Sequence, residues 1–157
     1  MKSFSISHKK EFMSAVLLHD DFDDFTLSEA TVKTAVSFVI DGKINADFFD
    51  SDDPAPSEPF VRYGEVRHFF FEIIKGKMTP VYFKFVFHAP NALTEKILVS
   101  VDSGFSIQDI NSLSFTATFK DGALSVISGT NLATFSLDKS VDEAWDKYVE
   151  GFLAKFE

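Results

Sequence analysis

Residues 113–128 of the chain read LSFTATFKDGALSVIS, and this stretch decides the fold class. Asp121-Gly122 in its middle is the dipeptide most typical of a two-residue turn between the strands of a β-hairpin. The flanking runs Leu113–Lys120 and Ala123–Ser128 are therefore predicted to be neighbouring antiparallel strands. We expect the chain to contain an antiparallel sheet built around this hairpin.

Other segments have the pattern of strands. After Pro80, apolar side chains alternate with more polar ones along residues 81–88, which predicts a strand with one strongly apolar face. Further strands are expected at three places: two within Phe25–Ile40, one at Lys43–Phe49 after a turn at Asp41-Gly42, and one at Leu132–Leu137 after a turn at Gly129-Thr130-Asn131.

The C-terminal residues have the spacing of an amphipathic helix. Ser140 followed by Glu143 has the pattern of a capping box at the first turn, and Glu143 and Lys147 are spaced for a favourable ion pair. The apolar stripe of this helix consists of Val141, Ala144, Trp145, Tyr148, Val149, Phe152, Leu153 and Phe156. We expect the stripe to bury Trp145 against the sheet.

Three more segments have helical spacing, namely His8–Leu18, Tyr63–Lys75 and Asn91–Asp102. Ser7 is placed to cap the first of them. Gly76 stands directly after the second, where helices often end in a left-handed residue. In the third, Ile97, Val99 and Val101 also alternate, so helix and strand both stay open for that segment.

Helices and strands are segregated along the chain more than they alternate, which favours an α+β fold. We expect an antiparallel sheet of about six strands, with three or four helices packed mainly on one face. A chain of 157 residues fits a single domain over residues 1–157. Three prolines and four acidic residues mark residues 50–59 as an exposed loop within that domain.

Composition narrows the class of protein and of partner. The formal net charge is −9 and the basic residues are scattered, which argues against nucleic-acid binding. The apolar runs are far shorter than the ~20 residues of a membrane helix, and cysteine is absent. We expect a soluble protein of the reducing cytoplasm without a nucleic-acid or membrane partner. The 20 phenylalanines are expected to fill the core, or alternatively to line a groove or a dimer interface.

Several stretches together resemble a known domain family. They are Phe71–Pro80, Ser128–Ser140 leading into Ala144-Trp145-Asp146, Ile40-Asp41-Gly42, and Phe48-Phe49. In these stretches the chain resembles a family of small bacterial proteins catalogued only as a domain of unknown function. The resemblance extends over nearly the whole chain. It implies one complete domain, but no activity, cofactor or site.

No stretch has the residue spacing of a metal, cofactor or nucleophile site. The densest polar cluster, His19–Asp24, lacks the glycine and distal glutamate of a calcium loop and predicts a solvated acidic turn. No two of the four histidines are three to five residues apart, so there is no zinc signature. Lys75-Gly76-Lys77 lacks the glycines of a phosphate loop and is interpreted as a helix end. We therefore expect no metal and no cofactor.

Two functional hypotheses follow. The first is a non-catalytic cytoplasmic binding or interaction module for a protein or small molecule, present as a monomer or homodimer. It is motivated by the lack of catalytic spacing and by the surplus of aromatic residues. The alternative is a small enzyme whose site is assembled from distant residues, with Arg67, His68, Glu72 and His88 as candidates. A pocket with converging polar groups favours the enzyme, and an exposed apolar surface favours the module.

Overall fold

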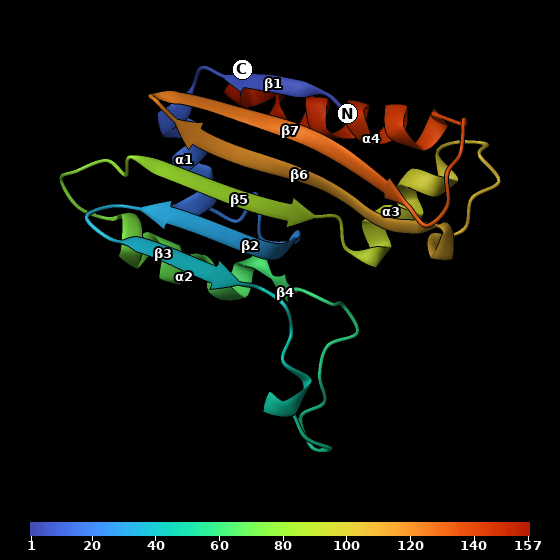
Figure 1. The fold of residues 1–157 in the computed structure, drawn as a ribbon, viewed down its shortest axis with the longest axis horizontal. Coiled ribbons are helices and arrows are strands. Elements are labelled where there is room, and N and C mark those ends of the chain that lie inside the picture. Colours follow the sequence, from blue (N-terminus) through green and yellow to red (C-terminus); the bar gives the residue numbers. More distant parts are fainter.

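The computed structural model describes residues 1–157 and contains one antiparallel sheet and four α-helices (Figure 1). The strands lie in the order β1-β7-β6-β5-β2-β3, and the short β4 pairs with the start of β2. Their bounds are β1 Ser3–Ile6, β2 Thr26–Lys33, β3 Ser37–Asp41, β4 Val61–Arg62, β5 Tyr82–His88, β6 Ile110–Lys120 and β7 Ala123–Leu132. The predicted α+β class is confirmed. β1 is an edge strand that the sequence did not indicate.

The predicted hairpin is formed by β6 and β7. Asp121-Gly122 has φ angles of +53° and +77°, as the two turn residues of a type I′ hairpin require. β7 continues through the predicted turn at Gly129-Thr130-Asn131, so that turn and the separate strand at Leu132–Leu137 are wrong. Gly129 pairs in register with Ser114. The long ladder with β6 satisfies the backbone here, and it outweighs the local turn preference of glycine and asparagine.

The predicted strand at Lys43–Phe49 is also wrong. After β3 the chain leaves the sheet, forms an isolated bridge between Lys43 and Phe60, and continues into a short 3-10 helix at Ala46–Phe48. The start of β2 pairs with β4 instead. β3 is the last strand of the sheet, and its outer edge stays unpaired. The strand propensity of the residues after Asp41-Gly42 was therefore not enough by itself to add a further strand.

The four α-helices are α1 Lys9–Leu18, α2 Tyr63–Ile74, α3 Asn91–Val99 and α4 Ser140–Leu153, and a 3-10 turn at Ala154–Phe156 follows α4. The helical alternative for residues 91–102 is confirmed over α3, and the strand alternative is wrong. The two predicted caps are wrong as well. His8 rather than Ser7 precedes α1, and Lys139 rather than Ser140 precedes α4, each without a side-chain cap. The Lys139 carbonyl accepts the N–H of Glu143 at 2.9 Å, which makes Lys139 the residue before the helix and Ser140 its first residue. The Asp138 carboxylate accepts the N–H of Ser140 at 2.9 Å.

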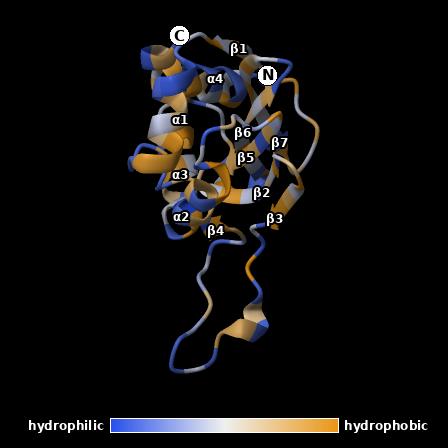
Figure 2. Cartoon of the chain, turned by 90° about the vertical axis from the view of Figure 1, so that its left-hand side faces the viewer, coloured by the Kyte–Doolittle hydropathy of each residue, from blue (hydrophilic) through white to orange (hydrophobic).

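The sheet has one buried face. Along β5, Phe83, Phe85 and Phe87 are buried, and the residues between them are partly exposed. The helices lie beside the sheet in the side view of Figure 2, and Tyr63 of α2 and Trp145 of α4 belong to the same core. The core also encloses ten of the 20 phenylalanines: Phe4, Phe12, Phe22, Phe25, Phe70, Phe83, Phe85, Phe87, Phe115 and Phe156. No helix has both the length and the apolar character needed to cross a membrane.

Candidate functional site

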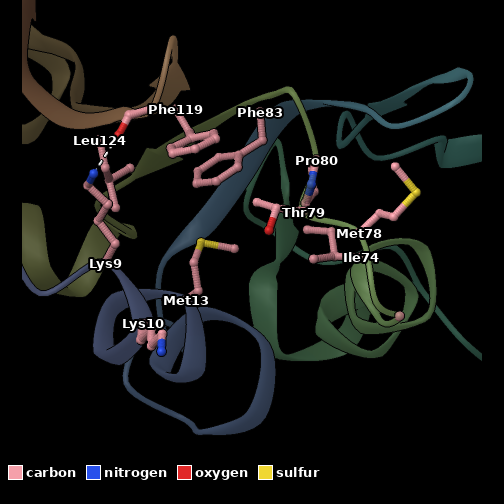
Figure 3. A pocket seen from close by; sticks show the side chains of 12 residues that line it. Lys9, Lys10, Met13, Ile74, Met78, Thr79, Pro80, Phe83, Phe119 and Leu124 are labelled. Atoms are coloured by element: carbon pink, nitrogen blue, oxygen red, sulfur yellow. Dashed lines mark hydrogen bonds between the residues drawn. The ribbon is translucent and has the colours of Figure 1, made fainter.

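An apolar pocket opens at the end of the sheet where β6 turns into β7. It lies between α1, the end of α2 with the loop that follows, and strands β5 to β7 (Figure 3). Its volume is about 350 Å³, and its apolar lining consists of Met13, Ile74, Met78, Phe83, Phe119 and Leu124. Ligand sites in proteins typically have volumes of roughly 300–1,000 Å³ and mainly apolar walls. This pocket, called the hairpin-end pocket below, has the size and lining of a small-molecule site.

The wall of the pocket follows from strand register. Phe83 of β5 and Phe119 of β6 are register partners, and their rings stack with centroids 5.4 Å apart and an interplanar angle of 14°. Phe12 of α1 is fully buried in the core, so its neighbour Met13 is turned aside, and its thioether faces the two rings (Figure 3). Thr79 points toward the same space from the loop after α2 (Figure 3). Aromatic rings and a flexible thioether make a wall that adapts to an apolar guest.

Positive charge lies at the mouth of the pocket. Lys9 and Lys10 line it from the first turn of α1. The Lys9 ammonium donates a hydrogen bond to the backbone carbonyl of Gly122, whereas Lys10 takes part in no ion pair. The start of a helix adds partial positive charge through its free N–H groups. The mouth therefore favours an anion, although the whole chain has a net charge of −9.

Gly76 also lines the pocket. Its φ is +136°, which is positive as expected for a residue after a helix end. The value lies beyond the left-handed helical region near +57°, and Lys75 before it has an extended ψ of 144°. The predicted positive φ is confirmed, but the residue is not a left-handed helical cap.

The four residues proposed for an enzyme are not joined in one site. Arg67 forms a bidentate ion pair with the almost buried Asp23, with N–O distances of 2.8 and 3.1 Å, and this hydrogen bond raises the pKa of Arg67. His68 and Glu72 are exposed on α2, and Glu72 pairs with Lys75 one turn later. These three residues lie on the helix that packs against the buried face of the sheet.

His88 lies elsewhere. It follows the inward-facing Phe87 along β5, so its side chain belongs to the opposite face, where it stacks on Phe60 with centroids 4.9 Å apart. Both imidazole nitrogens are buried without a hydrogen-bond partner, and burial lowers the pKa of His88. A small cavity of about 80 Å³ with a largely polar lining lies beside the ring. A cavity of this size has room for water, which commonly satisfies such buried polar groups.

The acidic cluster at residues 19–24 forms three ion pairs with basic residues elsewhere in the chain. Asp21, Asp23 and Asp24 pair with Lys155, Arg67 and Arg62 respectively. The hydrogen bond from Lys155 lowers the pKa of Asp21. No group of three or more histidine and acidic side chains is arranged to hold a metal ion. The predicted solvated turn is therefore partly wrong, since three of its carboxylates link the turn to β4, to α2 and to the C-terminal 3-10 turn.

The hairpin-end pocket was not apparent in the sequence. Its lining comes from residues between Lys9 and Leu124, and no short stretch supplies more than three apolar members of the wall. The nearest signal was the apolar alternation along β5, which identified Phe83 as inward-facing but not as part of a pocket.

Comparison with known proteins identifies a family whose function is unknown. Residues 15–157 match a family described as "Family of unknown function (DUF5721)". No curated protein and no solved structure is significantly similar to the chain. The resemblance to a domain family of unknown function is thus confirmed, and it covers every element from within α1 to the C-terminus.

Proposed function

The chain belongs to this family of unknown function, so we infer its function from the pocket itself. We propose that the protein is a non-catalytic binding module for a small amphipathic anion. The ligand has an apolar tail and one carboxylate or phosphate group. The tail lies against Phe83, Phe119 and Met13, and the anionic group lies near Lys10 at the mouth. We place this activity in the cytoplasm, with the absence of cysteine as support.

The observation that carries the proposal is the combination of an apolar wall with cations at the opening. Lys10 is part of the pocket mouth and has no carboxylate partner of its own, so a bound anion would not have to displace one. Asp and Glu outnumber Lys and Arg by 24 to 15 in this chain. Two adjacent lysines beside an apolar cavity are therefore a local exception to the charge of the protein.

The pocket fits a medium-length chain. Burial of one methylene contributes ~0.8 kcal/mol, so six buried methylenes contribute about 5 kcal/mol. That free energy corresponds to a dissociation constant in the range of roughly 0.1–1 mM, and the lysines tighten binding further. Decanoate is a suitable probe, with decan-1-ol and decyltrimethylammonium as ligands that share its tail but not its charge.

Titration calorimetry with these three probes tests the proposal. Decanoate is expected to bind most tightly, decan-1-ol more weakly and decyltrimethylammonium weakest. Lys10→Glu should weaken decanoate binding by about five- to tenfold, because it removes one attraction and adds one repulsion at an exposed site, and it should leave decan-1-ol unchanged. Lys147→Glu is the matched control, because Lys147 is an exposed lysine on α4 remote from the pocket.

A second variant tests the location. Thr79 is exposed and directed into the pocket (Figure 3), so Thr79→Trp fills the space without touching the core. It should abolish binding of decanoate and of decan-1-ol together, with an unchanged circular dichroism spectrum. Decanoate binding that survives in Thr79→Trp would place the ligand elsewhere and refute the proposal.

A further inference from the structure

A long arm leaves the body of the protein after β3 and returns at β4 (Figures 1 and 2). We define the arm as residues 45–58. Its base is held by the bridge between Lys43 and Phe60 and by hydrogen bonds from Ile44 N–H to the Pro59 carbonyl, 3.0 Å, and from Val61 N–H to the Gly42 carbonyl, 2.8 Å. The arm is therefore carried on a short antiparallel stem.

The tip of the arm is ordered by its own hydrogen bonds. Phe48 N–H and Phe49 N–H donate to the carbonyls of Asn45 and Ala46, each at 3.1 Å. The Asp50 carboxylate then accepts the N–H groups of the second and third residues after it, at 2.9 and 2.8 Å. A segment that holds its shape without the body of the protein loses less conformational entropy when it binds a partner.

The chemistry of the tip is that of an amphipathic anion. The Phe48 side chain is 84% exposed, and it stacks edge-on against Phe49 with centroids 5.4 Å apart. Four aspartates surround this pair, none of them takes part in an ion pair, and no lysine or arginine occurs between Lys43 and Arg62. These aspartates are Asp47, Asp50, Asp52 and Asp53. An aromatic ring is thus presented to solvent amid uncompensated negative charge.

We propose that Phe48 of one copy inserts into the hairpin-end pocket of a second copy, where Lys9 and Lys10 face the acidic tip. This inference rests on the pocket of the proposed function and names a macromolecular ligand for it. The two surfaces carry opposite charge, and the pocket has room for an aromatic ring. A cavity of about 150 Å³ is enough to hold benzene in an apolar protein interior, and the pocket here has about 350 Å³.

Strand register shows why the occupant is a second copy. The pocket lies at the end of the sheet where Tyr82 pairs with Lys33 and with Lys120. The arm follows Asp41, which pairs with Glu29 toward the opposite end of the same strands. The arm therefore points away from the pocket of its own copy. Two copies related by a two-fold axis can each offer an arm and a pocket, which closes the assembly as a dimer.

Sedimentation equilibrium at physiological ionic strength, up to about 1 mM protein, tests the assembly. We expect a reversible monomer–dimer equilibrium. Phe48→Ser should raise the dissociation constant of the dimer at least tenfold. Phe135→Ser is the matched control, because Phe135 is also a loop phenylalanine and is 88% exposed, and it should leave the constant unchanged. A chain that stays monomeric at 1 mM, or that dimerises equally well in both variants, overturns the inference.

A mixing experiment isolates the contact. A chain with Phe48→Ser has a free pocket and no aromatic tip, and a chain with Thr79→Trp has an intact arm and a blocked pocket. When the first is labelled at its methionine methyl groups and titrated with the second, the Met13 methyl resonance should shift saturably. An unlabelled chain carrying both substitutions should give no shift. If the Met13 resonance stays unmoved while decanoate still shifts it, the pocket binds small anions and the arm is not its ligand.

Binding of the arm without binding of decanoate would separate the contact between copies from the small-molecule function. If the arm shifts the Met13 resonance but decanoate neither binds nor dissociates the dimer, the small-molecule function fails and the contact between copies stands. If both hold, saturating decanoate should convert dimer to monomer because the two compete for one pocket. Failure of bound decanoate to dissociate the dimer would overturn the inference.

Discussion

Replacement of Trp145 is the most direct test of how the C-terminal helix stabilises the fold. Its side chain is fully buried, and its ring lies parallel to that of Tyr148, with centroids 5.4 Å apart and an angle of 9°. The indole N–H donates to the backbone carbonyl of Ser114 in β6 at 2.8 Å. The residue thus contributes both packing and a hydrogen bond between α4 and the sheet.

The expected cost of Trp145→Ala is about 3–5 kcal/mol, because a large buried aromatic is removed and the surroundings close only partly over the cavity. Trp145→Phe should cost less, about 1–3 kcal/mol, because the ring is largely kept but the Ser114 carbonyl loses its donor. The total stability of a domain is roughly 5–15 kcal/mol, so Trp145→Ala removes a large part of it.

Urea denaturation followed by far-ultraviolet circular dichroism measures these losses, since Trp145 is the only tryptophan and its fluorescence disappears with it. Phe135→Ala is the control, and a change within about 0.5 kcal/mol is expected there because the side chain is exposed. A loss below 1 kcal/mol in Trp145→Ala, with an unchanged dependence on urea, would show that α4 does not pack against the sheet as described.

The remaining predictions concern a glycine, a histidine, the arm and the acidic turn. Gly76→Ala should destabilise by about 1 kcal/mol in the same assay, because its φ is +136° and no atom lies within 4 Å of an added β-carbon, so that backbone strain alone acts. Burial lowers the pKa of His88 below 6.5, so the folded state favours the neutral ring. The free energy of unfolding should therefore fall as pH drops below about 6.5, by at most ~1.4 kcal/mol per pH unit. The His88→Phe variant should lose less of its free energy of unfolding than the unmodified protein between pH 7.5 and 5.5. Replacement of residues 50–57 by a short Gly/Ser link should leave the melting temperature nearly unchanged, since these residues are exposed, and limited proteolysis should cut there first. Exhaustive chelation should also leave the melting temperature unchanged, and a drop that calcium restores would identify residues 19–24 as a metal site.

Sequence patterns correctly predicted the elements that depend only on residues a few positions apart in the chain. Asp121-Gly122 formed its turn because both residues accept positive φ, whatever surrounds them. α4 formed because its apolar stripe has the helical period, and the stripe is buried as expected. The spacing of phenylalanines along β5 likewise identified the buried face of that strand.

Sequence patterns gave wrong predictions where the secondary structure of a segment depended on hydrogen-bond partners from other parts of the chain. Lys43–Phe49 has strand propensity, but it does not pair with the open edge of β3 and forms the first part of an arm instead. Ser140 has the capping pattern, but the first helical hydrogen bond is accepted by the Lys139 carbonyl, so Ser140 lies inside the helix and the Asp138 carboxylate accepts its N–H. β1 alternates polar and buried apolar residues, but its four residues are too few to predict a strand, and it forms because the edge of β7 offers it hydrogen-bond partners.

Backbone preferences and the period of neighbouring side chains were enough to predict the α+β class, the central hairpin, three of the four helices and the apolar face of the sheet, whereas residues 91–102 stayed open between helix and strand until the structure showed α3. The pocket and the arm depended on packing between distant segments. Packing brought Met13, Phe83 and Phe119 together around a pocket, set Lys10 beside it, and left Phe48 84% exposed on an arm. These placements depend on register and packing between segments up to about a hundred residues apart, and nothing in the spacing of neighbouring residues encodes them.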